Sequence, residues 1–127
     1  MDPRKAVGLP RGTVVWVDLE PARGHEQKGH RPCVIVSDSQ IIEDQRFPMI
    51  AVIPLTGTPG AGLLYPPLEP GPSGLLKRSF ALIDQLRSVD KARLTRVFGI
   101  VAPRELETID EGLRLFLGLE QDAEALF

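Results

Sequence analysis

Short apolar runs rich in β-branched residues alternate with polar segments along most of the chain, and this alternation predicts a mainly β fold. Five runs have the composition of buried strands: residues 14–17, 33–36, 50–55, 80–83 and 97–101. Turn-forming residues separate these runs, as they do in small β-barrels. We therefore expect an all-β body between residues 11 and 101, without an internal repeat or a linker.

The periodicity of the apolar residues changes after residue 101. Pro103 stands where the first residue of a helix is favoured, and apolar residues then recur at helical spacing: Leu106, Ile109, Leu113, Phe116 and Leu117. This pattern predicts one C-terminal amphipathic helix of about four turns that covers the barrel or its dimer interface. Acidic side chains are expected on its outer face: Glu105, Glu107, Asp110 and Glu111. Residues 120–127 are expected to be frayed or used in contacts that the pattern does not assign.

Length and composition indicate a single small domain over residues 1–127. No apolar run approaches the length of about eighteen residues that a membrane span needs, and the polar N-terminus does not lead into a signal peptide. We therefore expect a cytoplasmic protein. The lone Cys33 lies in an apolar run and is expected to pack as a small hydrophobic residue. One cysteine and two histidines form no zinc-ligand cluster, so we expect neither a metal nor a cofactor.

The net charge of −2 is unevenly distributed along the chain. Residues 104–127 hold two Lys or Arg against seven Asp or Glu, which leaves a surplus of three positive charges on residues 1–103. Nucleic-acid-binding domains usually have a basic surplus, so the charge of the whole chain argues against such a role. The body alone is compatible with a short RNA held through a few phosphate contacts, and not with a long non-specific track.

A dense polar loop separates the first two predicted strands. Residues 23–31 contain seven charged, titratable or amide side chains: Arg23, His25, Glu26, Gln27, Lys28, His30 and Arg31. A loop that joins two core strands needs turn residues but not this concentration of acids, bases and cations. The loop is therefore a candidate functional site, and an ordinary solvated hairpin loop is the alternative.

Four motifs in a fixed order resemble one known family. They are Arg-Gly-Thr-Val-Val-Trp-Val-Asp-Leu-Glu-Pro at residues 11–21, Gly-His-Glu-Gln-Lys-Gly-His-Arg-Pro at 24–32, Pro-Leu-Thr at 54–56, and Asp-Gln-Leu-Arg-Ser-Val-Asp-Lys-Ala-Arg-Leu at 84–94. Together they resemble the MazF/PemK family, the toxin endoribonucleases of bacterial toxin–antitoxin systems. The resemblance extends over roughly residues 10 to 118.

The resemblance implies a compact SH3-like barrel of the MazF/PemK/CcdB type with a C-terminal helix, assembled as a homodimer. It also implies metal-independent cleavage of single-stranded RNA at a short sequence. In that reaction a 2′-hydroxyl attacks the adjacent phosphate and leaves a 2′,3′-cyclic phosphate and a 5′-hydroxyl. The implied partner is a MazE-like antitoxin, whose disordered acidic tail folds along the RNA groove.

The catalytic assignments follow the matched motifs. Arg31 is expected to hold phosphate oxygens with its planar guanidinium, and Thr56 is expected to donate its hydroxyl to the phosphate. His25 is the natural proton shuttle, because an imidazole exchanges protons near neutral pH. Glu26 is the alternative base, since some family members have Ser in place of the histidine. The simpler interpretations are a surface ion pair for Arg31 and a turn residue bonded to its own backbone for Thr56.

A second group of residues is expected to contact the RNA: Gln27, Lys28, His30, Tyr65, Asp84 and Gln85. Tyr65 lies in residues 57–74, where ten of eighteen residues are Gly or Pro. It is expected either to stack on an unpaired base or to lie on the body of the domain. Asp84 matches a family acid that is assigned to catalysis or to base recognition. Leu82 stands where one branch of the family has Arg, which leaves Arg31 as the main cation.

Two other classes of function remain open. The same fold serves toxins that bind DNA gyrase and cleave nothing, so the fold alone does not decide the activity. A non-catalytic nucleic-acid-binding barrel is the third class, and it would not need the grouping of His25, Glu26 and Arg31. The motifs that contain Arg31 and Thr56 favour the nuclease.

Overall fold

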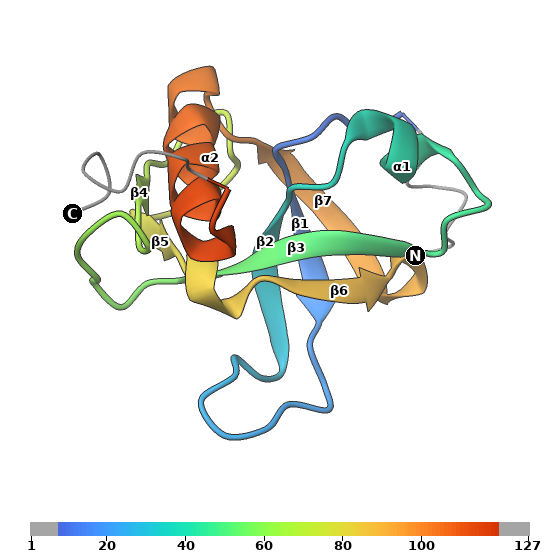
Figure 1. Ribbon diagram of the computed structural model, residues 1–127, viewed down its shortest axis with the longest axis horizontal. Coiled ribbons are helices and arrows are strands. Elements are labelled where there is room, and N and C mark those ends of the chain that lie inside the picture. The colour runs from blue at the N-terminus through green and yellow to red at the C-terminus, as the bar shows by residue number, and fades with distance from the viewer. Residues whose placement is uncertain (1–7, 120–127) are drawn as a thin grey trace.

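The computed structural model describes residues 8–119, and the segment 120–127 that is expected to be frayed lies outside them. Within that part of the chain seven strands form one sheet: β1 (Thr13–Asp18), β2 (His30–Ile35), β3 (Met49–Thr56), β4 (Pro67–Leu68), β5 (Ser79–Ala81), β6 (Arg87–Asp90) and β7 (Leu94–Ile100). The other elements are the helices α1 (Ser39–Glu43) and α2 (Pro103–Leu117) and the 3-10 turns η2 (Ile83–Gln85) and η3 (Lys91–Arg93). In Figure 1, α2 lies at one end of the sheet beside β4 and β5, and α1 lies at the opposite end.

The strands form a curled antiparallel sheet in the order β4-β5-β3-β2-β1-β7. The long strand β3 is central, because β2 pairs with one of its edges while β6 and β5 pair in succession with the other. In the described part of the chain β4 and β7, which end this order, do not pair with each other, so the sheet is a half-barrel. The expected mainly β, SH3-like fold with a C-terminal helix is confirmed.

Four of the five predicted strands match β1, β2, β3 and β7 within three residues. The fifth predicted run, residues 80–83, is divided, because the chain leaves β5 after Ala81 and turns into η2. The apolar pattern does not predict β6. In this strand only Val89 is buried, so an edge strand of four residues gives no readable alternation.

Alternating side chains of the strands build two hydrophobic clusters, one on each face of the sheet. On one face, Val15 and Val17 of β1 pack with Cys33 of β2 and with Ile42 of α1. On the other face, side chains of β1, β2 and β3 pack under α2. Cys33 is fully buried, and this burial raises the pKa of its thiol to about 12. The expectation that Cys33 packs as a hydrophobic residue is therefore confirmed.

The C-terminal helix α2 begins with the predicted proline and ends before Gly118, whose φ of 69° is the left-handed conformation that favours glycine. Ile109 is fully buried and Leu113 is only 9% exposed, as the helical spacing predicts. Phe116 and Leu117, expected on the same face, are 43% and 50% exposed. The sheet therefore covers the middle of α2 but not its last turn.

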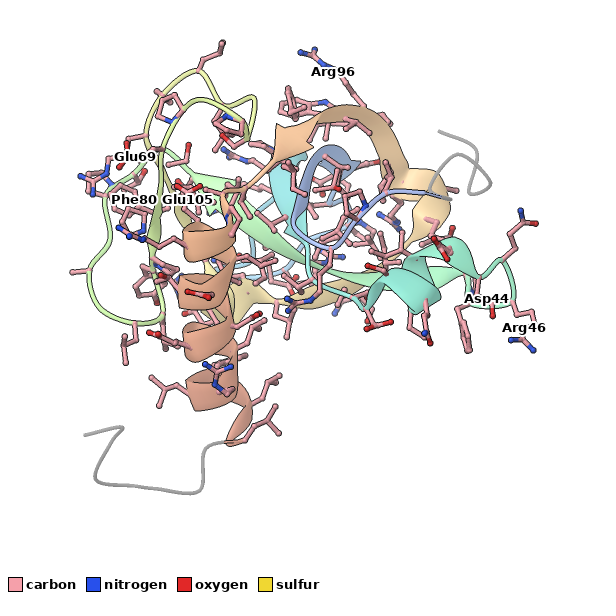
Figure 2. All side chains as sticks on the ribbon, turned by 90° about the horizontal axis from the view of Figure 1, so that it is seen from above. Asp44, Arg46, Glu69, Phe80, Arg96 and Glu105 are labelled. Carbon is pink, nitrogen blue, oxygen red and sulfur yellow. The ribbon has the colours of Figure 1, made fainter. Side chains whose placement is uncertain are left out.

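Two of the acidic side chains expected on the outer face of α2 bind other parts of the molecule, so the expectation was wrong for them. Asp110 forms a bidentate ion pair with Arg11, at 2.6 and 3.1 Å. Glu105 accepts the backbone N–H of Glu69 at 2.7 Å, and Figure 2 shows these two residues side by side at one end of the helix. The guanidinium of Arg11 stabilises the Asp110 carboxylate, and the backbone N–H of Glu69 stabilises that of Glu105, so neither carboxylate needs to face solvent.

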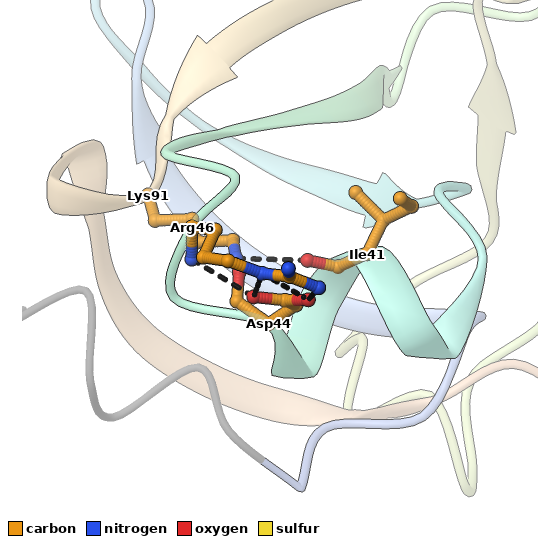
Figure 3. A network of polar contacts seen from close by, with 4 residues as sticks. All are labelled: Ile41, Asp44, Arg46 and Lys91. Atoms are coloured by element: carbon orange, nitrogen blue, oxygen red, sulfur yellow. Dashed lines mark hydrogen bonds and ion pairs between the residues drawn. The ribbon is translucent and has the colours of Figure 1, made fainter.

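The short helix α1 is held in place by a buried lysine. Lys91 is 2% exposed, and its Nζ donates to the carbonyl oxygens of Ile41 at 2.8 Å and Asp44 at 3.0 Å (Figure 3). These carbonyls lie at the C-terminal end of α1, where a positive charge is favourable. At the adjacent surface, hydrogen bonds from Arg46 lower the pKa of the Asp44 carboxyl to about 2.

Candidate active site

The polar loop that joins β1 to β2 projects beyond the edge of the sheet (Figure 1). Its base is closed by a backbone hydrogen bond from Leu19 to Gly29 at 2.9 Å. Gly29 has a φ of 74°, a conformation in which a larger residue would be strained. The carboxylate of Glu20 accepts the N–H of Gly29 at 2.9 Å, and that of Glu26 accepts the N–H of Arg23 at 2.6 Å. The loop is therefore a defined turn structure with its own hydrogen bonds.

Two adjoining hollows lie where this loop meets the turn η2. The first hollow has a volume of about 280 Å³, and its polar lining includes His25, Glu26, Gln27, Asp84, Gln85 and Arg87. The second hollow has a volume of about 490 Å³, and its polar lining includes His25, Gln27, Thr56, Tyr65, Asp84 and Gln85. Four residues line both hollows, so the fold brings together loop and η2 residues that are far apart in the sequence. Seven of the ten predicted site residues occur at these hollows, together with Pro54 of the Pro-Leu-Thr motif.

Gln85 joins η2 to the tip of the loop through both atoms of its side-chain amide. Its Oε1 accepts the backbone N–H of Gln27 at 2.6 Å, and its Nε2 donates to the backbone carbonyl of His25 at 3.2 Å. The side chain is half-buried. These two bonds bracket Glu26, so they fix the backbone that carries the predicted acid–base residues.

Tyr65 reaches the same place from the glycine- and proline-rich segment. Its hydroxyl donates to the carboxylate of Asp84 at 2.7 Å. This hydrogen bond and the negative charge of Asp84 raise the pKa of the Tyr65 phenol above its ordinary value of 10.0. Tyr65 is half-buried in the wall of the second hollow, so it lies against the body while one part of it stays accessible.

Thr56, the last residue of β3, lines the second hollow. Its Oγ1 accepts the backbone N–H of Thr58 at 3.1 Å. Accepting uses a lone pair and leaves the hydroxyl proton available as a donor. The turn contact and the proposed donor function are therefore compatible in one residue.

Arg31 is the second residue of β2, and its Nε donates to the carbonyl of Lys28 at 3.1 Å. The charges of Arg87 and Arg31 both lower the pKa of the buried Cys33 thiol, against the larger effect of burial. Arg31 is not among the residues that line the two hollows, so the expected main cation is not part of their walls.

Lys28 and His30 also lie outside the two hollows. The ring of His30 stacks on Trp16, with centroids 6.2 Å apart and an angle of 22° between the rings. Trp16 also meets Phe98 edge-on at 5.9 Å. Because successive residues of a strand point to opposite faces, this aromatic cluster and Arg31 lie on opposite faces of β2.

Arg87 is not among the predicted site residues, yet it lines the first hollow. It is half-buried, and its Nη1 donates to the carbonyl of Leu19 at the base of the loop, at 3.0 Å. The motif at residues 84–94 contains this arginine, and that motif is the sequence signal by which it could have been found. The strand that orients it, β6, does not show in the apolar pattern.

The described residues offer no group of three His, Cys, Asp or Glu side chains that could hold a metal ion. Within residues 8–119, no helix has both the length and the apolar character that a membrane crossing requires. The side chains that do meet at the hollows offer proton donors, proton acceptors, a hydroxyl and a cation.

Residues 10–117 match the family described as PemK-like, MazF-like toxin of type II toxin-antitoxin system. The chain belongs to this family. Endoribonuclease toxin MazF of Escherichia coli (strain K12) is 35% identical over 108 residues, which cover 84% of this chain and 92% of that protein. Endoribonuclease MazF9 of Mycobacterium tuberculosis is 36% identical over 117 residues, which cover 87% of this chain and 98% of that protein.

A solved structure of an endoribonuclease in complex with its cognate antitoxin, from a mycobacterial species, matches this fold with a TM-score of 0.74. The two sequences are 24% identical, and the match covers 91% of this chain and 100% of that chain, which shows the MazF-like fold. The resemblance read from the four motifs is thus confirmed. Given its identity to MazF relatives over most of its length, this chain is an endoribonuclease toxin of the MazF type.

Proposed function

We propose that this MazF-type toxin cuts single-stranded RNA at a short sequence without a metal ion, and that a cognate antitoxin inhibits it. One observation supports this proposal most. The acid–base groups of the polar loop, the Thr56 hydroxyl and the Asp84 carboxylate surround two adjoining hollows. A single RNA strand can place a phosphate beside the loop and its neighbouring bases over the hollows, a geometry that a paired helix does not offer.

The proposed reaction is a transfer of the phosphoryl group within the RNA. The 2′-oxygen attacks the adjacent phosphorus, and the bond from phosphorus to the 5′-oxygen breaks. A base removes the proton of the 2′-hydroxyl, and an acid supplies one to the leaving 5′-oxygen. The products are a 2′,3′-cyclic phosphate and a 5′-hydroxyl. Negative charge increases on the phosphoryl oxygens in the transition state, so the site needs positioned donors there.

Arg31 and Thr56 are the proposed donors to the phosphate. Within the described chain only the Nε of Arg31 is bonded, to the carbonyl of Lys28, so both terminal nitrogens can bind two oxygens at once. The hydroxyl proton of Thr56 can reach the same phosphate from the end of β3. Arg87 adds a positive charge in the wall of the first hollow.

His25 is the proposed proton shuttle, because its exposed imidazole lines both hollows. Glu26 is the alternative base, but one of its oxygens already accepts the N–H of Arg23. That bond leaves the second oxygen of Glu26 for proton transfer. The imidazole of His25 therefore has the better access to the reacting groups.

The remaining site residues are proposed to bind the strand on either side of the cleaved bond. Gln27, Tyr65 and Asp84 line the second hollow, where a base can be accommodated. Lys28 and His30 lie outside the hollows and are proposed to bind flanking phosphates or bases. These contacts supply affinity and sequence preference, and they do not take part in proton transfer.

The proposed assembly is a homodimer in the cytoplasm, with an antitoxin as its regulator. Three apolar side chains at the end of α2 or just after it are exposed by 43%, 50% and 61%: Phe116, Leu117 and Leu119. A second copy of the chain would bury them. The mycobacterial relative is an endoribonuclease in complex with its cognate antitoxin, and we propose that a MazE-like acidic segment occupies the RNA groove here as well.

The experiment that tests this function is cleavage of a defined single-stranded RNA in the presence of a chelator. We expect cuts at a short recurring sequence, with 2′,3′-cyclic phosphate and 5′-hydroxyl ends. Products with 5′-phosphate ends, or activity that returns only with added metal, would contradict the proposed chemistry. Intact RNA together with inhibition of DNA gyrase would support the alternative gyrase-binding toxin, and RNA binding without cleavage would support a binding barrel.

A further inference from the structure

The contacts of Gln85 point to a role that differs from the one its motif implies. From its place in the family motif, Gln85 is expected to contact the RNA. In the structure both polar atoms of its side chain are bonded to backbone atoms of the loop, at Gln27 and at His25. A side chain that already binds the protein through both atoms is poorly placed to read a base, because each new bond would compete with an existing one.

The contacts of Gln85 form part of a wider attachment. Arg87 donates to the carbonyl of Leu19 at 3.0 Å, and Arg93 donates to the carbonyl of Asp18 at 3.3 Å. Arg93 also donates to the carbonyl of Glu20. Thus three side chains from residues 85–93 bind backbone atoms of the loop, with the arginines at its base and Gln85 at its tip.

The attachment at the tip bears directly on the proposed proton shuttle. The loop tip is exposed or half-exposed at all three residues, His25, Glu26 and Gln27. None of the three belongs to either hydrophobic cluster. The position of this tripeptide therefore depends on polar contacts. Gln85 supplies two of them from a 3-10 turn whose first residue, Ile83, is fully buried. Through Gln85, the loop tip is therefore bonded to a turn that is anchored in the core.

We propose that Gln85 is a positioning residue, which holds the backbone of residues 25–27 so that the His25 side chain faces the cleaved phosphate. The inference rests on the proposed function for its catalytic part, but the attachment itself is a property of the protein without RNA. A catalytic group displaced by about 1 Å can lose on the order of 100-fold in rate. Loss of the Gln85 contacts is therefore expected to lower kcat rather than to raise KM.

The test uses two variants that separate the two hydrogen bonds. Gln85→Met has nearly the same length and shape but removes both bonds. Gln85→Glu keeps an oxygen that can accept the N–H of Gln27 but loses the donor to His25. Gln40→Met is the matched control, because Gln40 is exposed on α1 and its side chain has no recorded bond within the described chain.

Hydrogen exchange of backbone amides in the RNA-free protein is the first measurement. In Gln85→Met the protection of the Gln27 amide should fall about tenfold, in line with the loss of one hydrogen bond. In Gln85→Glu that amide should keep most of its protection. Amides of the β2–β3 ladder should be unchanged in both variants, which shows that the fold is intact. Unchanged exchange of Gln27 in Gln85→Met would overturn the attachment.

Steady-state cleavage of RNA is the second measurement. We expect Gln85→Met to lower kcat by about tenfold or more while KM stays within about twofold, and Gln40→Met to behave as the unchanged chain. A raised KM with unchanged kcat, or an altered cleavage sequence, would instead show that Gln85 reads the RNA. If the unchanged chain cleaves no RNA, the proposed function fails, whereas the exchange of Gln27 still decides whether Gln85 holds the loop.

Discussion

Tyr65 donates its phenolic hydrogen bond to the carboxylate of Asp84 at 2.7 Å, across nineteen positions of sequence. The bond ties the glycine- and proline-rich segment to the turn that also presents Gln85. Through this bond the irregular segment 57–74 places the ring of Tyr65 in the wall of the second hollow. The hydrogen bond to Asp84 therefore helps to hold the ring of Tyr65 in this wall.

The first prediction concerns the titration of Tyr65. Asp84 raises the pKa of the phenol above 10.0, and Asp84→Asn should lower it toward that value. Because the pKa in the folded state lies above that of the unfolded chain, this contact stabilises the fold below pH 10.0 and is lost as the pH rises through the raised pKa. The near-ultraviolet absorbance of the phenolate measures this directly, since Tyr65 is the only tyrosine. Identical titration curves for the two proteins would contradict the contact.

His25 is expected to shape the pH dependence of cleavage. His25→Ser should retain measurable activity, since Glu26 can accept a proton, but its pH–rate profile should shift because an imidazole titrates near neutral pH. The measurement is kcat/KM across the pH range in which both proteins stay folded. An unchanged profile would exclude His25 as a titrating group in the reaction.

The thiol of Cys33 should be inert in the folded protein. Burial raises its pKa to about 12, so almost no thiolate is present near neutral pH, and the side chain is fully covered. A chromogenic disulfide reagent should report one thiol per chain in denaturant and almost none under native conditions. Rapid reaction of the native protein would show that the cluster on this face of the sheet opens readily.

Gly112 should not tolerate alanine, although α2 is a helix. An added Cβ would lie 2.6 Å from the carbonyl oxygen of Leu63 and 3.1 Å from Cγ1 of Ile83. The intrinsic helix preference for Ala over Gly is worth about 1 kcal/mol, whereas overpacking costs about 1–3 kcal/mol. Gly112→Ala should therefore lower the free energy of unfolding in a denaturant titration, while Glu111→Ala at the exposed neighbour should change it by less than about 0.5 kcal/mol. A gain in stability for Gly112→Ala would mean that the helix can move away from residue 63.

The apolar pattern predicted those elements whose own residues are mostly apolar or recur at a regular spacing. The strands β1 and β3 are nearly continuous apolar runs, and the apolar residues of α2 repeat at helical spacing, so the burial of these elements is readable from the residues alone. β6 could not be predicted in this way, because its pairing with β3 and not its composition makes it a strand. Arg87 was missed as a consequence, since its orientation depends on that pairing.

The contacts of the site residues could be predicted even less, because they depend on how distant segments of the chain meet in the fold. The sequence placed His25, Asp84 and Gln85 in motifs, and the structure shows that these motifs meet at shared hollows. That Gln85 binds the loop backbone could not be read from the motif, because its partners are 58 and 60 positions away. His30 likewise lies in the same motif as Arg31 but packs on Trp16, since alternate residues of a strand face opposite sides.

Single-turnover cleavage in the presence of a chelator tests the central claim most directly, if Arg31→Ala and Thr56→Ala are compared with the unchanged chain. Each variant should lose at least about 100-fold in rate, as expected when a donor to the transition-state charge is removed. Arg23→Ala is the matched control, since Arg23 is an exposed arginine of the same loop whose backbone N–H bond to Glu26 alanine would keep and which has no proposed contact with the phosphate. It should cleave at a rate within about twofold of the unchanged chain. Cleavage near the original rate by either Arg31→Ala or Thr56→Ala, with the fold intact, would contradict the proposed site.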